Sequence, residues 1–110
     1  MDRLKYNAEA MVQIERRISQ LRTLSVSEAK ALPEVSGEEE ITLADIPATI
    51  TIFRQQNPHN LPDAVLVTVQ VARTRLLGFG SSHIEKGLVF CTDKKVRDAT
   101  NSELQNSLGG

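Results

Sequence analysis

Residues 64–77, AVLVTVQVARTRLL, carry the strongest strand signal in the chain. Valine recurs at every second position from Val65 to Val71, and this period of two places four valines on one face of a β-strand. Fourteen residues at about 3.3 Å each would span roughly 46 Å, which exceeds the usual strand length. We therefore expect this strand to twist, bend or carry a bulge.

Alternation with a period of two extends to both sides of this stretch. The predicted strands are 41–43, 48–55, 64–77, 82–92 and 95–98. The connections between them are short, and short connections favour antiparallel neighbours. The expected sheet is therefore a four- to five-stranded antiparallel meander.

Residues 3–22 have the periodicity of an amphipathic helix. Its apolar residues are Leu4, Met11, Ile14, Ile18 and Leu21. The same spacing would suit a dimeric coiled coil, but that heptad seam would run through Asn7 and Ser25. We therefore expect the helix to cover one face of the chain's own sheet.

Capping signals predict two shorter helices. Ser25 with Glu28 has the spacing of a capping box, and Pro33 ends that helix. A second capping box at Thr100 opens a helix at 100–108. The predicted fold is therefore a single α+β domain over 1–110. Its segments are 1–33 (helical), 34–40 (an acidic connection), 41–98 (antiparallel sheet) and 100–108 (a short C-terminal helix).

The composition excludes several classes of protein. Thirteen Lys and Arg residues against fourteen Asp and Glu give a net charge of −1, so the bulk charge indicates no polyanionic partner. The longest apolar run, Ala64 to Val67, is too short for a transmembrane helix, and we expect no membrane contact. With Cys91 as the one cysteine, an internal disulfide is impossible. We expect a cytoplasmic protein.

The sequence contains no complete catalytic or metal-binding motif. Gly78 and Gly80 begin a dinucleotide-binding pattern, but His83 stands where its third glycine belongs. Ser82 and His83 are adjacent in a predicted strand, so their side chains point to opposite faces. The metal candidates are His59, Asp63, His83, Glu85 and Cys91, and their spacing does not form a zinc site. We expect no catalytic residues, no metal and no cofactor.

Arg73, Arg75 and His83 are the candidate ligand-binding residues. Arg73 and Arg75 continue the valine face beyond the expected reach of helix 3–22. Two guanidinium groups on one strand face suit a phosphate or carboxylate. The alternative is that both arginines extend from the rim of the core into solvent.

The other sheet face is the candidate interface, because one long and two short helices do not easily cover both faces of such a sheet. The residues expected there are Phe53, Leu66, Thr68, Gln70 and Ala72. A mixture of apolar and threonine side chains suits a protein partner or solvent exposure. With only four aromatic residues, the chain lacks a base-stacking surface, and we expect no nucleic-acid partner.

The predicted function is therefore a non-catalytic protein-interaction or regulatory module that associates with itself as a homodimer or with another protein. The alternative is a small-ligand (anion) binding protein, or a small enzyme, with a pocket between the sheet and the helix.

Overall fold

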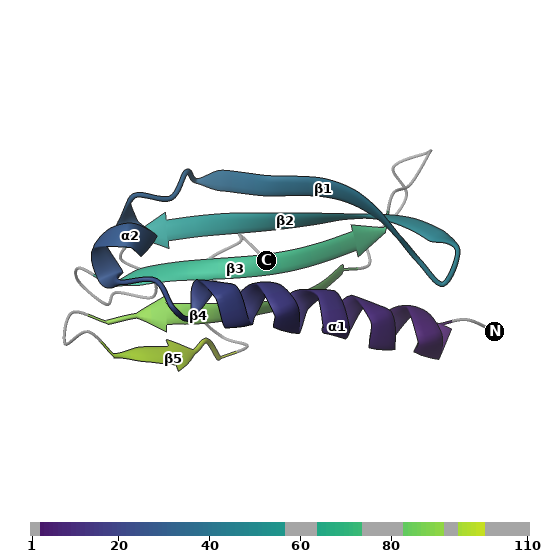
Figure 1. The fold of residues 1–110 in the computed structure, drawn as a ribbon, viewed down its shortest axis with the longest axis horizontal. Helices are drawn as coiled ribbons and strands as arrows, with labels where there is room; N and C mark the ends of the chain where they lie inside the picture. The colour runs from purple at the N-terminus through teal and green to yellow at the C-terminus, as the bar shows by residue number, and fades with distance from the viewer. Residues whose placement is uncertain (1–2, 57–63, 74–82, 92–94, 101–110) are drawn as a thin grey trace.

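The computed structural model describes residues 3–56, 64–73, 83–91 and 95–100, which form two helices and a five-stranded sheet (Figure 1). The elements are α1 (Arg3–Leu21), α2 (Val26–Lys30), β1 (Val35–Leu43), β2 (Ile46–Gln56), β3 (Val65–Arg73), β4 (His83–Phe90) and β5 (Val96–Asp98). The strands lie in chain order, and each pairs antiparallel with the next. The predicted α+β meander is confirmed. The predicted helix at 100–108 falls almost wholly outside the described residues.

The valine face of β3 forms the centre of the core. Val65, Val67, Val69 and Val71 are all fully buried. In the register of the sheet, Val71 lies between Ile50 of β2 and Ile84 of β4. This face packs against α1, which lies mainly over β3 and β4 (Figure 1).

The buried stripe of α1 differs from the predicted one. Its buried residues are Tyr6, Ala10, Ile14, Ile18 and Leu21. Leu4 is 83 % exposed, so its assignment to the core is wrong. Because a helix turns by about 100° per residue, Leu4 lies about 160° around the helix from Tyr6, the buried residue nearest to it, and falls on the outer side.

Residues 34–40, predicted as an acidic connection, mostly form the first half of β1. β1 is an edge strand, and its register with β2 shifts between Ser36 and Glu39. At this bulge Gly37 has a φ of +61°, a conformation that glycine adopts without strain. Charged side chains are compatible with an edge strand because they remain in solvent and discourage pairing between sheets.

The capping box that begins α2 is confirmed. The Glu28 backbone N–H donates to Ser25 Oγ over 3.1 Å, and the Ser25 N–H donates to the Glu28 carboxylate over 2.8 Å. This short helix lies at the end of the sheet where β2 ends and β3 begins (Figure 1). No helix in the described part of the chain is long and apolar enough to span a membrane.

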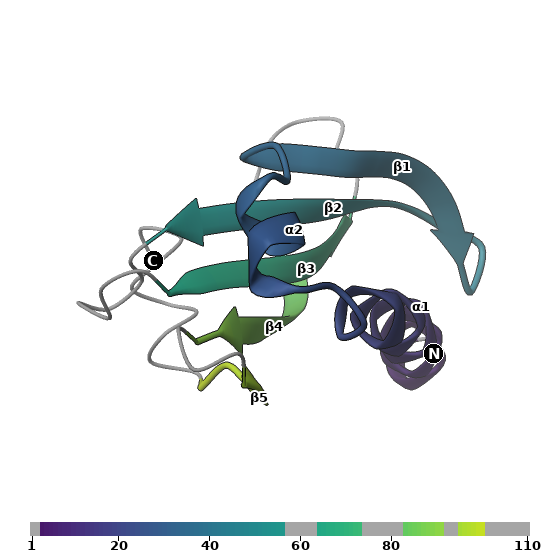
Figure 2. The ribbon, with the colours of Figure 1, turned by 60° about the vertical axis from the view of Figure 1, so that its left-hand side comes forward.

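Ion pairs join α1 to both edges of the sheet. Arg17 pairs with Glu39 of β1, and Arg22, the residue directly after α1, pairs with Asp98 of β5 over 2.8 Å. Figure 2 shows α1 close to end-on, with the β1 side of the sheet curving toward it.

Candidate binding surfaces

Of the three predicted ligand-binding residues, the structure describes the side chain of Arg73 alone. Arg75 lies outside the described residues, as does the side chain of His83, whose backbone pairs with Ala72. The guanidinium carbon of Arg73 lies 5.8 Å from the centroid of the Tyr6 ring. The expectation that α1 stops short of Arg73 is therefore wrong, because Tyr6 belongs to the first turn of α1.

Tyr6 brings a polar group into the core at this contact. The residue is 5 % exposed, and its hydroxyl has no hydrogen-bond partner in the described part of the chain. Burial raises the pKa of the Tyr6 hydroxyl, and the positive charge of Arg73 lowers it by a smaller amount. The described side chains at this place, Arg73 and Tyr6, form a cation–π contact. The predicted pairing of Arg73 with Arg75 in an anion site stays a prediction, because Arg75 lies outside the described residues.

The predicted interface residues divide into a buried and a partly exposed group. Leu66 and Thr68 are each 1 % exposed, whereas Phe53, Gln70 and Ala72 are half-buried. Leu66 belongs to a second apolar cluster with Ala64, Val89, Cys91 and Ala99. The centre of this outer face is therefore buried, and its accessible part includes Phe53 of β2 and Gln70 and Ala72 of β3.

Val35 is the residue of this face that the sequence analysis missed. It is 52 % exposed and pairs with Phe53 across β1 and β2. Val35 and Phe53 border a hollow of about 440 Å³ that is also lined by Leu66 and Thr68. We call this the outer-face hollow. A sequence signal existed, because Val35 is the one apolar residue within 34–40.

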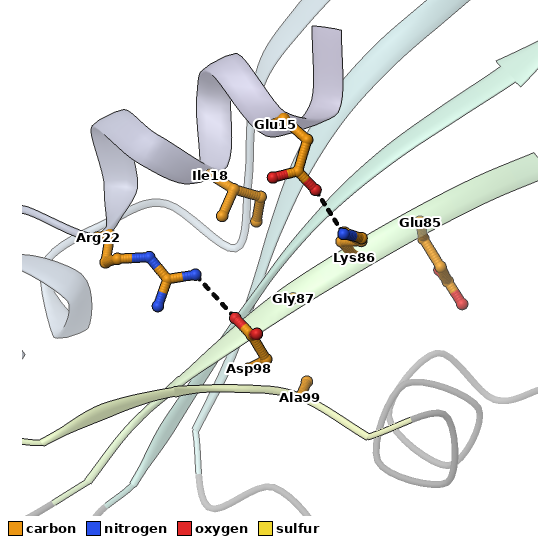
Figure 3. Close-up of a pocket in the computed structure, with 8 residues that line it drawn as sticks. All are labelled: Glu15, Ile18, Arg22, Glu85, Lys86, Gly87, Asp98 and Ala99. Carbon is orange, nitrogen blue, oxygen red and sulfur yellow. Dashed lines mark hydrogen bonds and ion pairs between the residues drawn. The ribbon is translucent and has the colours of Figure 1, made fainter. Parts of the chain in front are cut away.

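A groove between α1 and β4–β5 is shown in Figure 3. Its volume is about 210 Å³, and the side chain of Ile18 points into it from α1 (Figure 3). Its two cations are both paired: Lys86 with Glu15, and Arg22 with Asp98. With both of its cations already paired, this groove offers little attraction to an anionic ligand.

A larger groove, of about 520 Å³, separates α1 from β1, and we call it the α1–β1 groove. Its apolar lining is Leu21, Leu24, Leu32 and Ile52, and its polar lining is Gln13, Arg16, Arg17, Gln20 and Glu39. It exists because α1 lies over β3 and β4 and leaves part of β2 uncovered. Accordingly Ile50 is fully buried, but Ile52 on the same face is partly exposed.

In the residues that the structure describes, no group of three or more His, Cys, Asp or Glu side chains has the arrangement of a metal site. Comparison of the chain with protein-family models, curated proteins and solved structures found no match.

Proposed function

We propose that the protein is a non-catalytic interaction module that associates with a second copy of itself through the outer-face hollow. The observation that supports this most directly is the pair formed by Val35 and Phe53. Val35 is an exposed apolar residue at the border of a hollow, next to an aromatic side chain that is only partly covered. Burial of such side chains is favourable by about 25 cal/mol per Å² of apolar surface.

A two-fold contact suits this surface because one patch then serves both copies. The acidic edge of β1 argues against pairing of the two sheets edge to edge. Such pairing would bring Glu38 and Glu40 of one copy close to the same carboxylates of the other, and like charges in neighbouring strands are destabilising. The proposed contact therefore uses the face of the sheet at Val35 and leaves its edge in solvent.

The test is a Val35→Lys variant studied by light scattering after size-exclusion chromatography. Burying an unpaired lysine at the contact should convert the dimer to a folded monomer. Val12→Lys is the matched control, because Val12 is 56 % exposed on the outer side of α1, away from the hollow. Equal masses for the two variants would contradict the proposed contact. The cytoplasmic location expected from the sequence belongs to this proposal and fits a chain with one cysteine.

A second candidate function is the binding of a small ligand between the helix and the sheet. The observation that favours it is the α1–β1 groove. Its volume of about 520 Å³ and its apolar floor with a polar rim are typical of ligand sites.

A further inference from the structure

We propose that the α1–β1 groove binds a small amphipathic anion, a molecule with an unbranched aliphatic chain and a carboxylate or phosphate head. This inference rests on the second candidate function and adds the chemical class of the ligand. Three features of the groove suit such a ligand: its apolar floor, its rigidity and the charge at its rim.

The floor of the groove is apolar and incompletely covered. Leu24, Leu32 and Ile52 pack against the core cluster and are only partly buried. They come from the turn before α2, the segment after α2 and the middle of β2. An aliphatic chain lying on them would remove their remaining apolar surface from water, which is favourable in proportion to the area covered.

The floor is also held in place. The Arg54 side chain donates from Nε to the backbone carbonyl of Leu32 over 2.6 Å, which fixes the segment after α2 to β2. Ile52 packs against the bulge at Gly37, where an added methyl group would meet Ile52 Cδ1 at 3.0 Å. Binding therefore requires little ordering of the floor, and less ordering means a lower entropic cost.

The rim of the groove is positively charged. Arg17 is engaged by Glu39 and by the Gln13 side chain at 3.3 Å. Arg16 is exposed and forms no ion pair with the described residues, so the three charged side chains of the groove leave one positive charge unmatched. In the α1–β4 groove of Figure 3, by contrast, both cations are paired. Guanidinium groups bind carboxylate and phosphate by charge-assisted hydrogen bonds.

The experiment is titration of the whole protein with ligands that share a ten-carbon chain, below their micelle concentrations, by calorimetry and amide NMR. We expect decanoate or decyl phosphate, or both, to bind and to shift the amide signals of Leu24, Leu32 and Ile52. Decyltrimethylammonium, which has the opposite charge, should bind at least about tenfold more weakly, and acetate, which lacks the chain, should not bind measurably up to about 1 mM.

Two variants test whether Arg16 supplies the positive charge that attracts the anionic head group of the ligand. Arg16→Gln should weaken binding of the anionic ligand by about tenfold. Lys5→Gln, which removes one positive charge from the exposed side of the same helix, should leave binding unchanged. Both side chains are exposed, so we expect both variants to keep the wild-type thermal unfolding midpoint.

Three results would overturn the inference. If decyltrimethylammonium binds as well as decanoate, the groove takes apolar chains without selecting an anion, and only the second candidate function stands. Amide shifts confined to residues outside the groove would place the ligand elsewhere. If none of these ligands binds up to about 1 mM, both the inference and the second candidate function fail.

Discussion

The guanidinium group of Arg73 lies over the ring of Tyr6, with 5.8 Å between the guanidinium carbon and the ring centroid. The contact joins the end of β3 to the first turn of α1, so the helix reaches the last described residue of β3. Lengths explain this reach: nineteen residues of helix extend about 28 Å, and nine residues of strand extend about 30 Å.

Replacement of Tyr6 by Phe should stabilise the protein. The buried hydroxyl of Tyr6 has no partner in the described part of the chain, and its removal should raise the free energy of unfolding by about 1 kcal/mol. The ring and its contact with Arg73 are retained in Tyr6→Phe. Urea unfolding at neutral pH measures the difference. A loss of stability by more than about 1 kcal/mol would show that the hydroxyl makes a favourable hydrogen bond.

The stability of the protein should also decline at alkaline pH because of Tyr6. Burial raises the pKa of its hydroxyl in the folded state, so folding favours the protonated form. The stabilisation is fully present below the unfolded pKa of about 10 and is lost as the pH rises through the higher folded pKa. Tyr6 is the one tyrosine of the chain, so absorbance of the tyrosinate reports its titration directly. A folded-state pKa at or below about 10 would contradict the burial of the hydroxyl.

The corrected stripe of α1 predicts different effects for two apolar residues of the helix. Ile14→Ala should lower the free energy of unfolding by about 2–5 kcal/mol, because Ile14 is fully buried and its removal leaves a cavity. Leu4→Ala should change it by no more than about 0.5 kcal/mol, because Leu4 is exposed. Chemical denaturation compares the two. A similar decrease in the free energy of unfolding in both variants would mean that Leu4 is buried in the core.

The bulge in β1 predicts that Gly37 is sensitive to substitution. Gly37→Ala should cost about 1–2 kcal/mol, since alanine is strained at a φ of +61° and its methyl group would crowd Ile52. Ser36→Ala, at the neighbouring position of the same edge strand, is the control and should have a smaller effect. An unchanged unfolding midpoint for Gly37→Ala would mean that the bulge lies elsewhere.

The sheet could be predicted from the sequence because its central strands are buried on the helix side. On that side β3 carries valine at every second position from Val65 to Val71, whereas the other side includes Thr68 and Gln70, so a period of two is visible in the sequence. β1 was predicted only from Ile41 onward because an edge strand with few buried residues accepts glutamates and a bulged glycine. Its composition is then that of a loop, although Val35 and Glu39 pair with β2.

The candidate sites were harder to predict because they depend on where α1 ends and on which strands it lies over. The position of Arg73 beside Tyr6 depends on the length and crossing of α1, which periodicity does not give. The α1–β1 groove depends on α1 lying over β3 and β4 rather than over β2. Its apolar residues come from three separate segments, at Leu24, Leu32 and Ile52, so no local pattern joins them.

The most direct test of the proposed function is the mass of the unmodified protein in solution. Light scattering at about 100 μM, a concentration at which a micromolar dimer is nearly complete, should report about twice the chain mass of 12.1 kDa. A mass of 12.1 kDa at that concentration would contradict self-association through Val35 and Phe53.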